Sequence, residues 1–290
     1  MEPTRTSSGQ RLAIGKFWMR CAGDLPDPVY RDLVSTLFSM RAVIVGFGAL
    51  YVIVGALIYS KWHDVGIAAL TVSAIAVTVA RVMLISAYDR AGGSAQPVAG
   101  LRRWERRYEI LTYLFALLLS GINIRVLMEH EPLVHISTIS LVFTFGAGIV
   151  SRNAGRPRLC VIALALSVVP TALTMFIHAA SDYAEPLHAE FFIFEALLLL
   201  AVAGMSLGSI GHLYTVTVDH LTTKHDLAKL ARFDALTGLP NRLSLRESFQ
   251  SGLRSSQQAT SQLAIHYMDL DGFKSINDRY GHPAGDKMLL

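Results

Sequence analysis

The chain has 290 residues, of which 52% are hydrophobic and 17% are charged, and its mean hydropathy is +0.41. Because soluble proteins carry about 25% charged residues, this composition excludes an ordinary soluble protein and is typical of a membrane protein. The formal net charge is +4. The basic residues lie between apolar runs, a pattern that is explained by membrane topology and anionic lipid and does not require nucleic acid as a partner.

Residues 1–41 predict a cytoplasmic N-terminal arm of polar and mixed composition. No small-residue cleavage site follows the first apolar run, so the arm does not have the pattern of a signal peptide. The cysteines of the chain are Cys21 and Cys160. They are far apart and lack metal-ligand spacing, which favours two unpaired thiols over a disulfide framework or a zinc site.

Residues 42–213 predict a sensor domain of six transmembrane helices. A helix that crosses a bilayer needs about 17–25 predominantly apolar residues, and six segments meet this requirement. They are Ala42–Ser60, Val65–Tyr88, Glu109–Met128, Pro132–Ser151, Leu159–Ala179 and Glu190–Leu213.

The loops between these segments predict their orientation. Fourteen basic residues lie in the arm and in the loops after the second and fourth segments, whereas only Lys61 and Arg125 lie on the opposite side. The positive-inside rule then places both termini in the cytoplasm, as an even number of spans also requires.

Several polar residues lie inside or near the spans. Arg81 and Glu195 have two interpretations, a ligand pathway or a side chain near a span end that snorkels to the interface, and the second is favoured. Ordinary packing is likewise favoured over a haem or copper site for four histidines, because no pair has i, i+4 spacing on one helix. They are His135, His178, His188 and His212.

Residues 214–232 predict a signalling linker helix without glycine or proline. Tyr214, Val218, Leu221, His225 and Ala228 follow a 4-3-4-3 spacing. This spacing permits a short parallel coiled coil between two protomers, and a solvated helical linker is the alternative.

The final segment, residues 233–290, changes to a mixed pattern. Asp234–Arg242 is polar and contains Gly238 and Pro240, which end a helix. The next predicted helix, Leu243–Ser255, has apolar residues at i, i+4 and i+8 on one face. Leu263–Met268 then predicts a strand that is buried on both faces.

The residues after this strand suit nucleotide chemistry. Asp269 stands at the predicted strand tip, where a divalent cation can bridge a carboxylate to a phosphate. Gly272 allows close approach of the backbone to a bulky ligand, and Lys274 adds a positive charge. Asn277 and Asp286 offer groups that can read the edge of a purine.

Two motifs, DALTGLPNR at 234–242 and MDLDGFKSINDRYGHPAGD at 268–286, together resemble the first part of the GGDEF domain of diguanylate cyclases. The resemblance implies an α/β fold, nucleotidyl-cyclase-like and ferredoxin-related, after the multi-span α-helical membrane domain. It also implies roles for individual residues: Asp269 and the backbone carbonyl of Leu270 bind metal, Phe273 and Lys274 form the phosphate turn, Asn277 and Asp286 bind guanine, and Asp271 and His282 support the geometry.

The same resemblance implies GTP as substrate, Mg²⁺ or Mn²⁺ as cofactor, a homodimer across the GGDEF domains, and a multi-pass location in the bacterial inner membrane. The GG(D/E)EF signature does not occur before Leu290, so the chain by itself is expected to be inactive and to have a poorly ordered C-terminus. The alternatives are a degenerate GTP-binding regulatory module, followed or not by an EAL phosphodiesterase domain, and a non-enzymatic membrane receptor.

Overall fold

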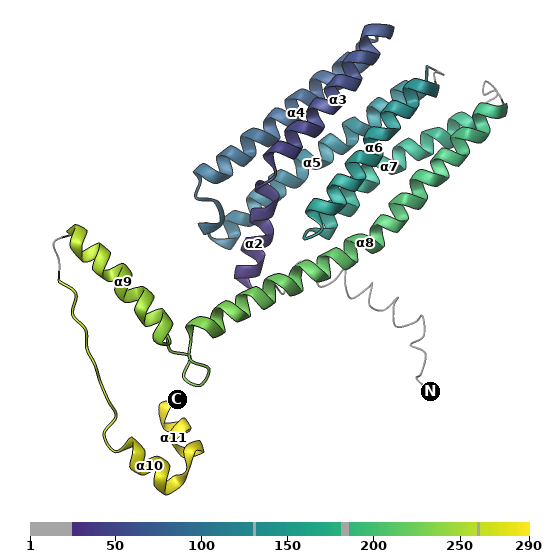
Figure 1. Cartoon of the computed structure of the whole chain (residues 1–290). Helices are drawn as coiled ribbons and strands as arrows, with labels where there is room; N and C mark the ends of the chain where they lie inside the picture. Colours follow the sequence, from purple (N-terminus) through teal and green to yellow (C-terminus); the bar gives the residue numbers. More distant parts are fainter. Residues whose placement is uncertain (1–24, 130–131, 181–185, 260–261) are drawn as a thin grey trace, which may run out of the picture. The chain divides into compact units, whose positions relative to one another are not determined.

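The structure is a computed structural model that describes residues 25–129, 132–180, 186–259 and 262–290. The chain forms two compact units, Met1–Asp219 and His220–Leu290, which are described separately. Within the described ranges the regular elements are all helical (Figure 1).

The first unit contains the predicted membrane helices. Six helices of the described residues are long and apolar enough to cross a bilayer, which confirms the six segments predicted from hydropathy. The elements of this unit are α2 (Asp27–Phe38), α3 (Arg41–Trp62), α4 (Val65–Arg90), the short 3₁₀ helix η1 (Gly93–Ala95), α5 (Val98–Leu127), α6 (Pro132–Asn153), α7 (Pro157–Ala179) and most of α8 (Pro186–Arg232).

Helix α5 occupies the centre of this unit and contacts α2, α4, α6 and α7. Phe115, Leu119 and Ile122 of α5 are fully buried within a large apolar cluster that takes residues from the surrounding helices. The buried Tyr51 hydroxyl of α3 donates a hydrogen bond of 2.8 Å to the carbonyl of Leu118. This bond satisfies a polar group that would otherwise be costly to bury.

Two glycines allow α3 to pack closely against α4. A Cβ at Gly48 would lie 3.1 Å from Cβ of Thr78, and a Cβ at Gly55 would lie 3.2 Å from Cβ of Thr71; both would lie closer still to the threonine hydroxyls. Small residues are common where membrane helices approach each other, so these positions explain the close α3–α4 contact.

The predicted arm contains a folded element. Asp27–Phe38 forms α2, and its residues Val29, Leu33, Val34 and Leu37 are buried. Its apolar residues recur at helical spacing and cover one end of the bundle, so this part of the arm belongs to the packed unit. The basic residues at positions 5–20 and Cys21 lie outside the described residues.

The polar residues inside the spans are packed within the bundle. Arg81 is only 6% exposed, and its guanidinium carbon lies 5.5 Å from the ring centre of Tyr108. This position differs from the predicted snorkelling arrangement, because aromatic faces of α5 receive the cation. Glu195 lies 3.3 Å from Nδ1 of the buried His135, which links α8 to α6.

Helix α8 runs from Pro186 to Arg232 and includes both the sixth predicted span and the predicted linker. The linker is therefore helical, as predicted, and it continues the span without a break. The second unit then contains α9 (Arg242–Ala259), α10 (Phe273–Tyr280) and α11 (His282–Leu289).

The strand predicted at Leu263–Met268 is not formed in the structure. The described residues contain no β-strand, and Ile265, Tyr267 and Met268 are 69%, 98% and 88% exposed rather than buried. A strand needs a neighbour to pair its backbone N–H and C=O groups, and no described segment pairs with this one. The α/β part of the predicted fold class therefore remains an expectation.

Candidate nucleotide-binding segment

The first motif forms a compact turn that joins α8 to α9. Phe233 and Pro240 form an isolated antiparallel bridge, and the backbone N–H of Asp234 donates to the carbonyl of Leu239 at 2.8 Å. Gly238 has φ +68°, a left-handed conformation that glycine adopts without strain. Gly238 and Pro240 therefore lie in the turn that reverses the chain between α8 and α9.

Asp234 organises the interior of this turn. One oxygen of its carboxylate accepts hydrogen bonds from the backbone N–H of Thr237 at 2.9 Å and from the Thr237 hydroxyl at 3.0 Å. The backbone hydrogen bond from Thr237, followed by the hydroxyl bond, lowers the pKa of Asp234 below its ordinary value of 3.8. This carboxylate is therefore a structural group of the turn.

Asn241 connects the two helices directly. Its Nδ2 donates to the carbonyl of Ala231 in α8 at 2.9 Å, while its Oδ1 accepts from the backbone N–H of Leu243 at 3.0 Å and of Ser244 at 3.2 Å. The second set of bonds is an N-cap for α9, because the first backbone N–H groups of a helix have no partner within it.

The apolar face predicted for the helix after this turn is present but remains exposed. Leu245, Phe249 and Leu253 of α9 are 65%, 38% and 38% exposed. Phe249 and Leu245 line an open hollow together with Ile265, and the side chain of Leu263 approaches Gly252. The segment that was predicted as a strand therefore lies beside this face without completing a core.

The predicted metal ligands lie in the exposed turn before α10. Oδ1 of Asp269 accepts a local hydrogen bond of 2.9 Å from the backbone N–H of Leu270, and the carbonyl of Leu270 accepts one of 3.4 Å from Phe273. Asp269 and Asp271 are both exposed. Gly272 has φ +74° and forms the cap at which α10 begins.

The predicted phosphate-binding residues are at the start of α10. Phe273 and Lys274 occupy its first two positions, directly after Gly272. The N-terminus of a helix presents unpaired N–H groups and a partial positive charge, both of which favour a phosphate group. The exposed side chain of Lys274 adds a full positive charge at the same end.

Of the two predicted guanine-binding residues, Asn277 lies against the residue that precedes Asp286. Asn277 of α10 lies directly against the backbone of Gly285 in α11, so closely that a Cβ at Gly285 would lie 2.8 Å from Cγ of Asn277. Gly285 is buried and immediately precedes the exposed Asp286. Gly285 entered the sequence-based prediction only as a member of the second motif, and this contact was not predicted.

His282 takes a place that fits a supporting role. It is the first residue of α11, after Gly281, whose φ of +80° turns the chain between α10 and α11. The backbone N–H of Gly281 donates to the carbonyl of Asn277 at 2.9 Å and ends α10. The α10–turn–α11 hairpin is thus fixed by two glycines and holds Asn277 in place.

The oxygen atoms near Asp269 suit a hard divalent cation. The described residues contain no group of three histidine, cysteine or acidic side chains that would hold a metal by themselves. Mg²⁺ is nevertheless commonly bound by one or two protein oxygens together with water and substrate phosphates. The Asp269 carboxylate and the Leu270 carbonyl fit this mode of binding.

Comparison with known proteins finds a family match within the second unit. Residues 231–290 match the family model described as "Diguanylate cyclase, GGDEF domain". The chain is 42% identical over 65 residues to the bifunctional diguanylate cyclase/cyclic di-GMP phosphodiesterase MucR of Pseudomonas aeruginosa, an overlap of 22% of this chain and 10% of that protein. It is 45% identical over 64 residues to the diguanylate cyclase TpbB of the same species, 22% of this chain and 15% of that protein.

A third relative is named for a different activity. The cyclic di-GMP phosphodiesterase PdeB of Shewanella oneidensis is 43% identical over 82 residues, which are 28% of this chain and 9% of that protein. The chain spans a tenth or less of the length of the first curated relatives it matches. No solved structure matches the chain.

Proposed function

We propose that the protein is a membrane-bound diguanylate cyclase, which joins two molecules of GTP into cyclic di-GMP, releases pyrophosphate, and is controlled by its helical membrane region. The single observation that carries the proposal is the GGDEF-family match over residues 231–290, which follows a region with six apolar helices. The location proposed is the bacterial inner membrane, with both termini in the cytoplasm, where GTP is available.

The residues of the second unit have the following roles in this proposal. Asp269 and the Leu270 carbonyl hold Mg²⁺ or Mn²⁺, which when bound neutralises charge on the reacting phosphate. Phe273 and Lys274 position the phosphates at the start of α10. Asp286 accepts from the guanine N1–H and N2–H₂ groups and excludes adenine, which lacks these donors, and Asn277 completes guanine recognition.

Asp271 and His282 support this geometry without touching the nucleotide. Each protomer binds one GTP, and a homodimer brings the two nucleotides face to face so that each 3′-hydroxyl meets the other α-phosphate. The linker part of α8 supplies a helix that can pair with its copy, and its seam residues Val218, Leu221 and His225 are partly buried even in the single chain.

The 290-residue chain alone is expected to convert no GTP. Among the described residues, the segment at 262–270 has no strand beside it, and the apolar face of α9 is uncovered. A segment without a partnered sheet cannot hold Asp269 at a fixed strand tip. Measurable synthesis of cyclic di-GMP by the purified 290-residue chain would contradict this expectation.

The experiment that tests the proposed function uses the protein expressed from its complete reading frame. Cyclic di-GMP formed from GTP and Mg²⁺ is measured by mass spectrometry for the parent protein and for Asp269→Ala, Asn277→Ala and Asp286→Ala. Each substitution is expected to reduce synthesis by at least about tenfold. Asp278→Ala, at an exposed acid on the same helix α10, is the matched control and should retain activity.

A second candidate function is favoured by the relatives that are named phosphodiesterases. In that case the segment is a degenerate module that binds GTP and regulates an EAL domain. Binding of GTP without synthesis, together with hydrolysis of cyclic di-GMP that GTP stimulates, would support this function. Absence of both GTP binding and synthesis would instead indicate a non-enzymatic membrane receptor.

A further inference from the structure

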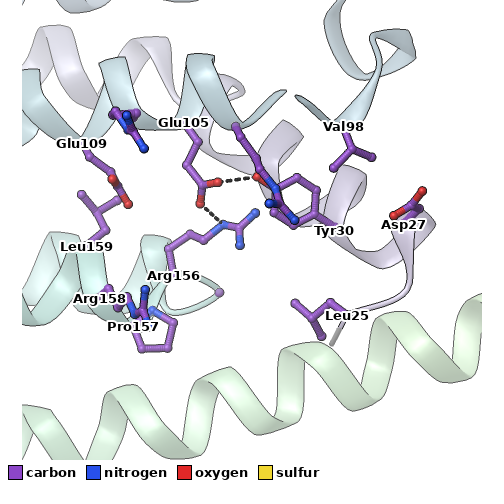
Figure 2. Close-up of a pocket in the computed structure, with 13 residues that line it drawn as sticks. Leu25, Asp27, Tyr30, Val98, Glu105, Glu109, Arg156, Pro157, Arg158 and Leu159 are labelled. Carbon is purple, nitrogen blue, oxygen red and sulfur yellow. Dashed lines mark hydrogen bonds and ion pairs between the residues drawn. The ribbon is translucent and has the colours of Figure 1, made fainter. Parts of the chain in front are cut away.

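A polar cavity of about 360 Å³ lies at one end of the first unit (Figure 2). Three segments form it: the start of α2, the first turns of α5, and the connection between α6 and α7. All three belong to the end of the bundle that the basic loops assign to the cytoplasm. The cavity is within the size range of small-ligand pockets.

The floor of this cavity is a buried cation. Arg156 is 8% exposed, and its Nε lies 2.8 Å from Oε1 of Glu105. Its guanidinium carbon lies 4.6 Å from the ring centre of Tyr30, whose hydroxyl donates to Oε2 of Glu105 at 2.5 Å. Figure 2 shows these three side chains directed toward one another, with dashed lines at the two polar contacts.

Arg156 retains an unused hydrogen-bond donor. Among the described residues, its buried Nη2 has no hydrogen-bond partner, and its Nε, although 2.8 Å from Oε1 of Glu105, has no aligned hydrogen bond either. Burying a guanidinium donor without an acceptor is costly, while both oxygens of Glu105 are already engaged. The buried guanidinium group is therefore short of hydrogen-bond acceptors.

Three further arginines surround the same cavity. Arg102, Arg106 and Arg158 line it and are exposed. In the part of the chain that the structure describes, none of them forms an ion pair with a carboxylate, although Glu109 and Asp27 also line the cavity. Four arginines thus line the cavity, and the ion pair described among them is the one between Arg156 and Glu105.

From this geometry we propose that the cavity binds a phosphate group. A guanidinium group offers a planar pair of donors that matches phosphate oxygens. The guanidinium group of Arg156, which lines the cavity and is short of acceptors, supplies a specific donor, and the exposed arginines supply charge at the mouth. The source of the phosphate is either the headgroup of an anionic phospholipid, since basic pockets between membrane helices on the cytoplasmic side bind such headgroups, or a soluble phosphate.

The test compares two double variants of the full chain in neutral detergent. Arg102→Gln/Arg106→Gln removes two cavity arginines, which are spaced i, i+4 on α5. Arg103→Gln/Arg107→Gln removes two exposed arginines with the same spacing on the same helix that do not line the cavity. The two variants therefore lose the same charge, and circular dichroism checks that both are folded.

The probes are dihexanoyl phosphatidylglycerol, with dihexanoyl phosphatidylcholine as the neutral counterpart, and sodium phosphate, with sodium chloride at equal ionic strength. The parent chain should show a higher Tm with phosphatidylglycerol than with phosphatidylcholine, or a higher Tm with sodium phosphate than with sodium chloride. The cavity variant should bind about tenfold more weakly, and the control variant should bind like the parent.

The outcomes separate the sources and can overturn the proposal. Stabilisation by phosphatidylglycerol alone assigns the cavity to a lipid headgroup, whereas stabilisation by phosphate as well assigns it to a phosphate group in general. Equal weakening in both double variants would show non-specific attraction and overturn the proposal. No stabilisation of the parent chain by either anionic probe would overturn it as well.

Discussion

The side-chain amide of Asn241 donates a hydrogen bond of 2.9 Å to the carbonyl of Ala231, ten positions earlier in the chain. The same side chain caps α9, so one residue terminates α8 and begins the next helix. The start of the segment that matches the GGDEF family is therefore held to the C-terminal end of α8 by these hydrogen bonds.

Replacing Asn241 should destabilise the first turn of α9. Asn241→Ala removes the N-cap of α9 and is expected to cost about 1 kcal/mol locally. Amide hydrogen exchange in the first turn of α9 should then accelerate about fivefold. Gln250→Ala, at an exposed position of the same helix, is the control and should leave that exchange unchanged.

The Asp234–Thr237 hydrogen bonds predict a measurable titration. They lower the pKa of Asp234 below 3.8, so the charged carboxylate favours the turn above pH 3.8, and this contribution is lost as the pH falls through the lower folded pKa. Thr237→Ala should move the pKa part of the way back up, because the hydroxyl bond is lost and the backbone bond remains. Nuclear magnetic resonance titration of the Asp234 carboxyl carbon measures the change, and Thr237→Ser, which keeps the hydroxyl, should preserve the low value.

Close packing at Gly285 predicts a specific effect on nucleotide binding. Gly285→Ala places a methyl group against Asn277, which must move away from the neighbourhood of Asp286. In the protein with its complete GGDEF domain, KM for GTP is expected to rise by about tenfold through the lost guanine contact. Gly208→Ala, where a Cβ would have nothing within 4 Å, should leave KM unchanged; equal effects of both substitutions would argue against the role of Asn277.

The α3–α4 contact predicts a size limit at one glycine. Gly55→Ala introduces a methyl group against Thr71 and should destabilise the unit by about 1–3 kcal/mol. Gly46→Ala on the same helix faces open space and should be neutral. Thermal unfolding in detergent compares the two variants. Adding Thr71→Ala to Gly55→Ala should restore part of the lost stability if the clash is the cause.

If regulation passes through the linker part of α8, it should depend on the rotational position of the residues beyond the linker. Inserting one residue within Thr222–Lys229 rotates everything beyond it by about 100° relative to the membrane region, whereas inserting seven residues nearly restores the phase. In the complete protein, the first insertion should change regulated synthesis of cyclic di-GMP and the second should change it less. Identical regulation in both variants would count against control through this helix.

Sequence periodicity predicted the membrane unit well because long apolar runs have few alternative structures. The runs at 42–60 and 65–88 correspond to α3 and α4 within a few residues at each end. Helix α2 was missed because it is short and lies in an arm of polar and mixed composition, and only its packing against α5 shows that its apolar residues are buried.

The candidate site was predicted as a set of residues but not as a geometry. Asn277 and Asp286 stand nine positions apart in the sequence, and the hairpin between α10 and α11 places Asn277 against Gly285, the residue before Asp286. The strand Leu263–Met268 was predicted from a short apolar run and from the alternation of Leu263, Ile265 and Tyr267. Alternation describes which side chains share a face, but it does not supply the neighbouring backbone that makes a strand.

The length of α8 has a mechanical consequence. Its 47 residues correspond to a rod of about 70 Å, at 1.5 Å per residue. Such a rod carries torque from one end to the other, because turning its first residues without its last requires backbone hydrogen bonds to break somewhere between them. In the proposed cyclase, a rotation of the apolar part of α8 would therefore reach position 232 through the helix backbone itself.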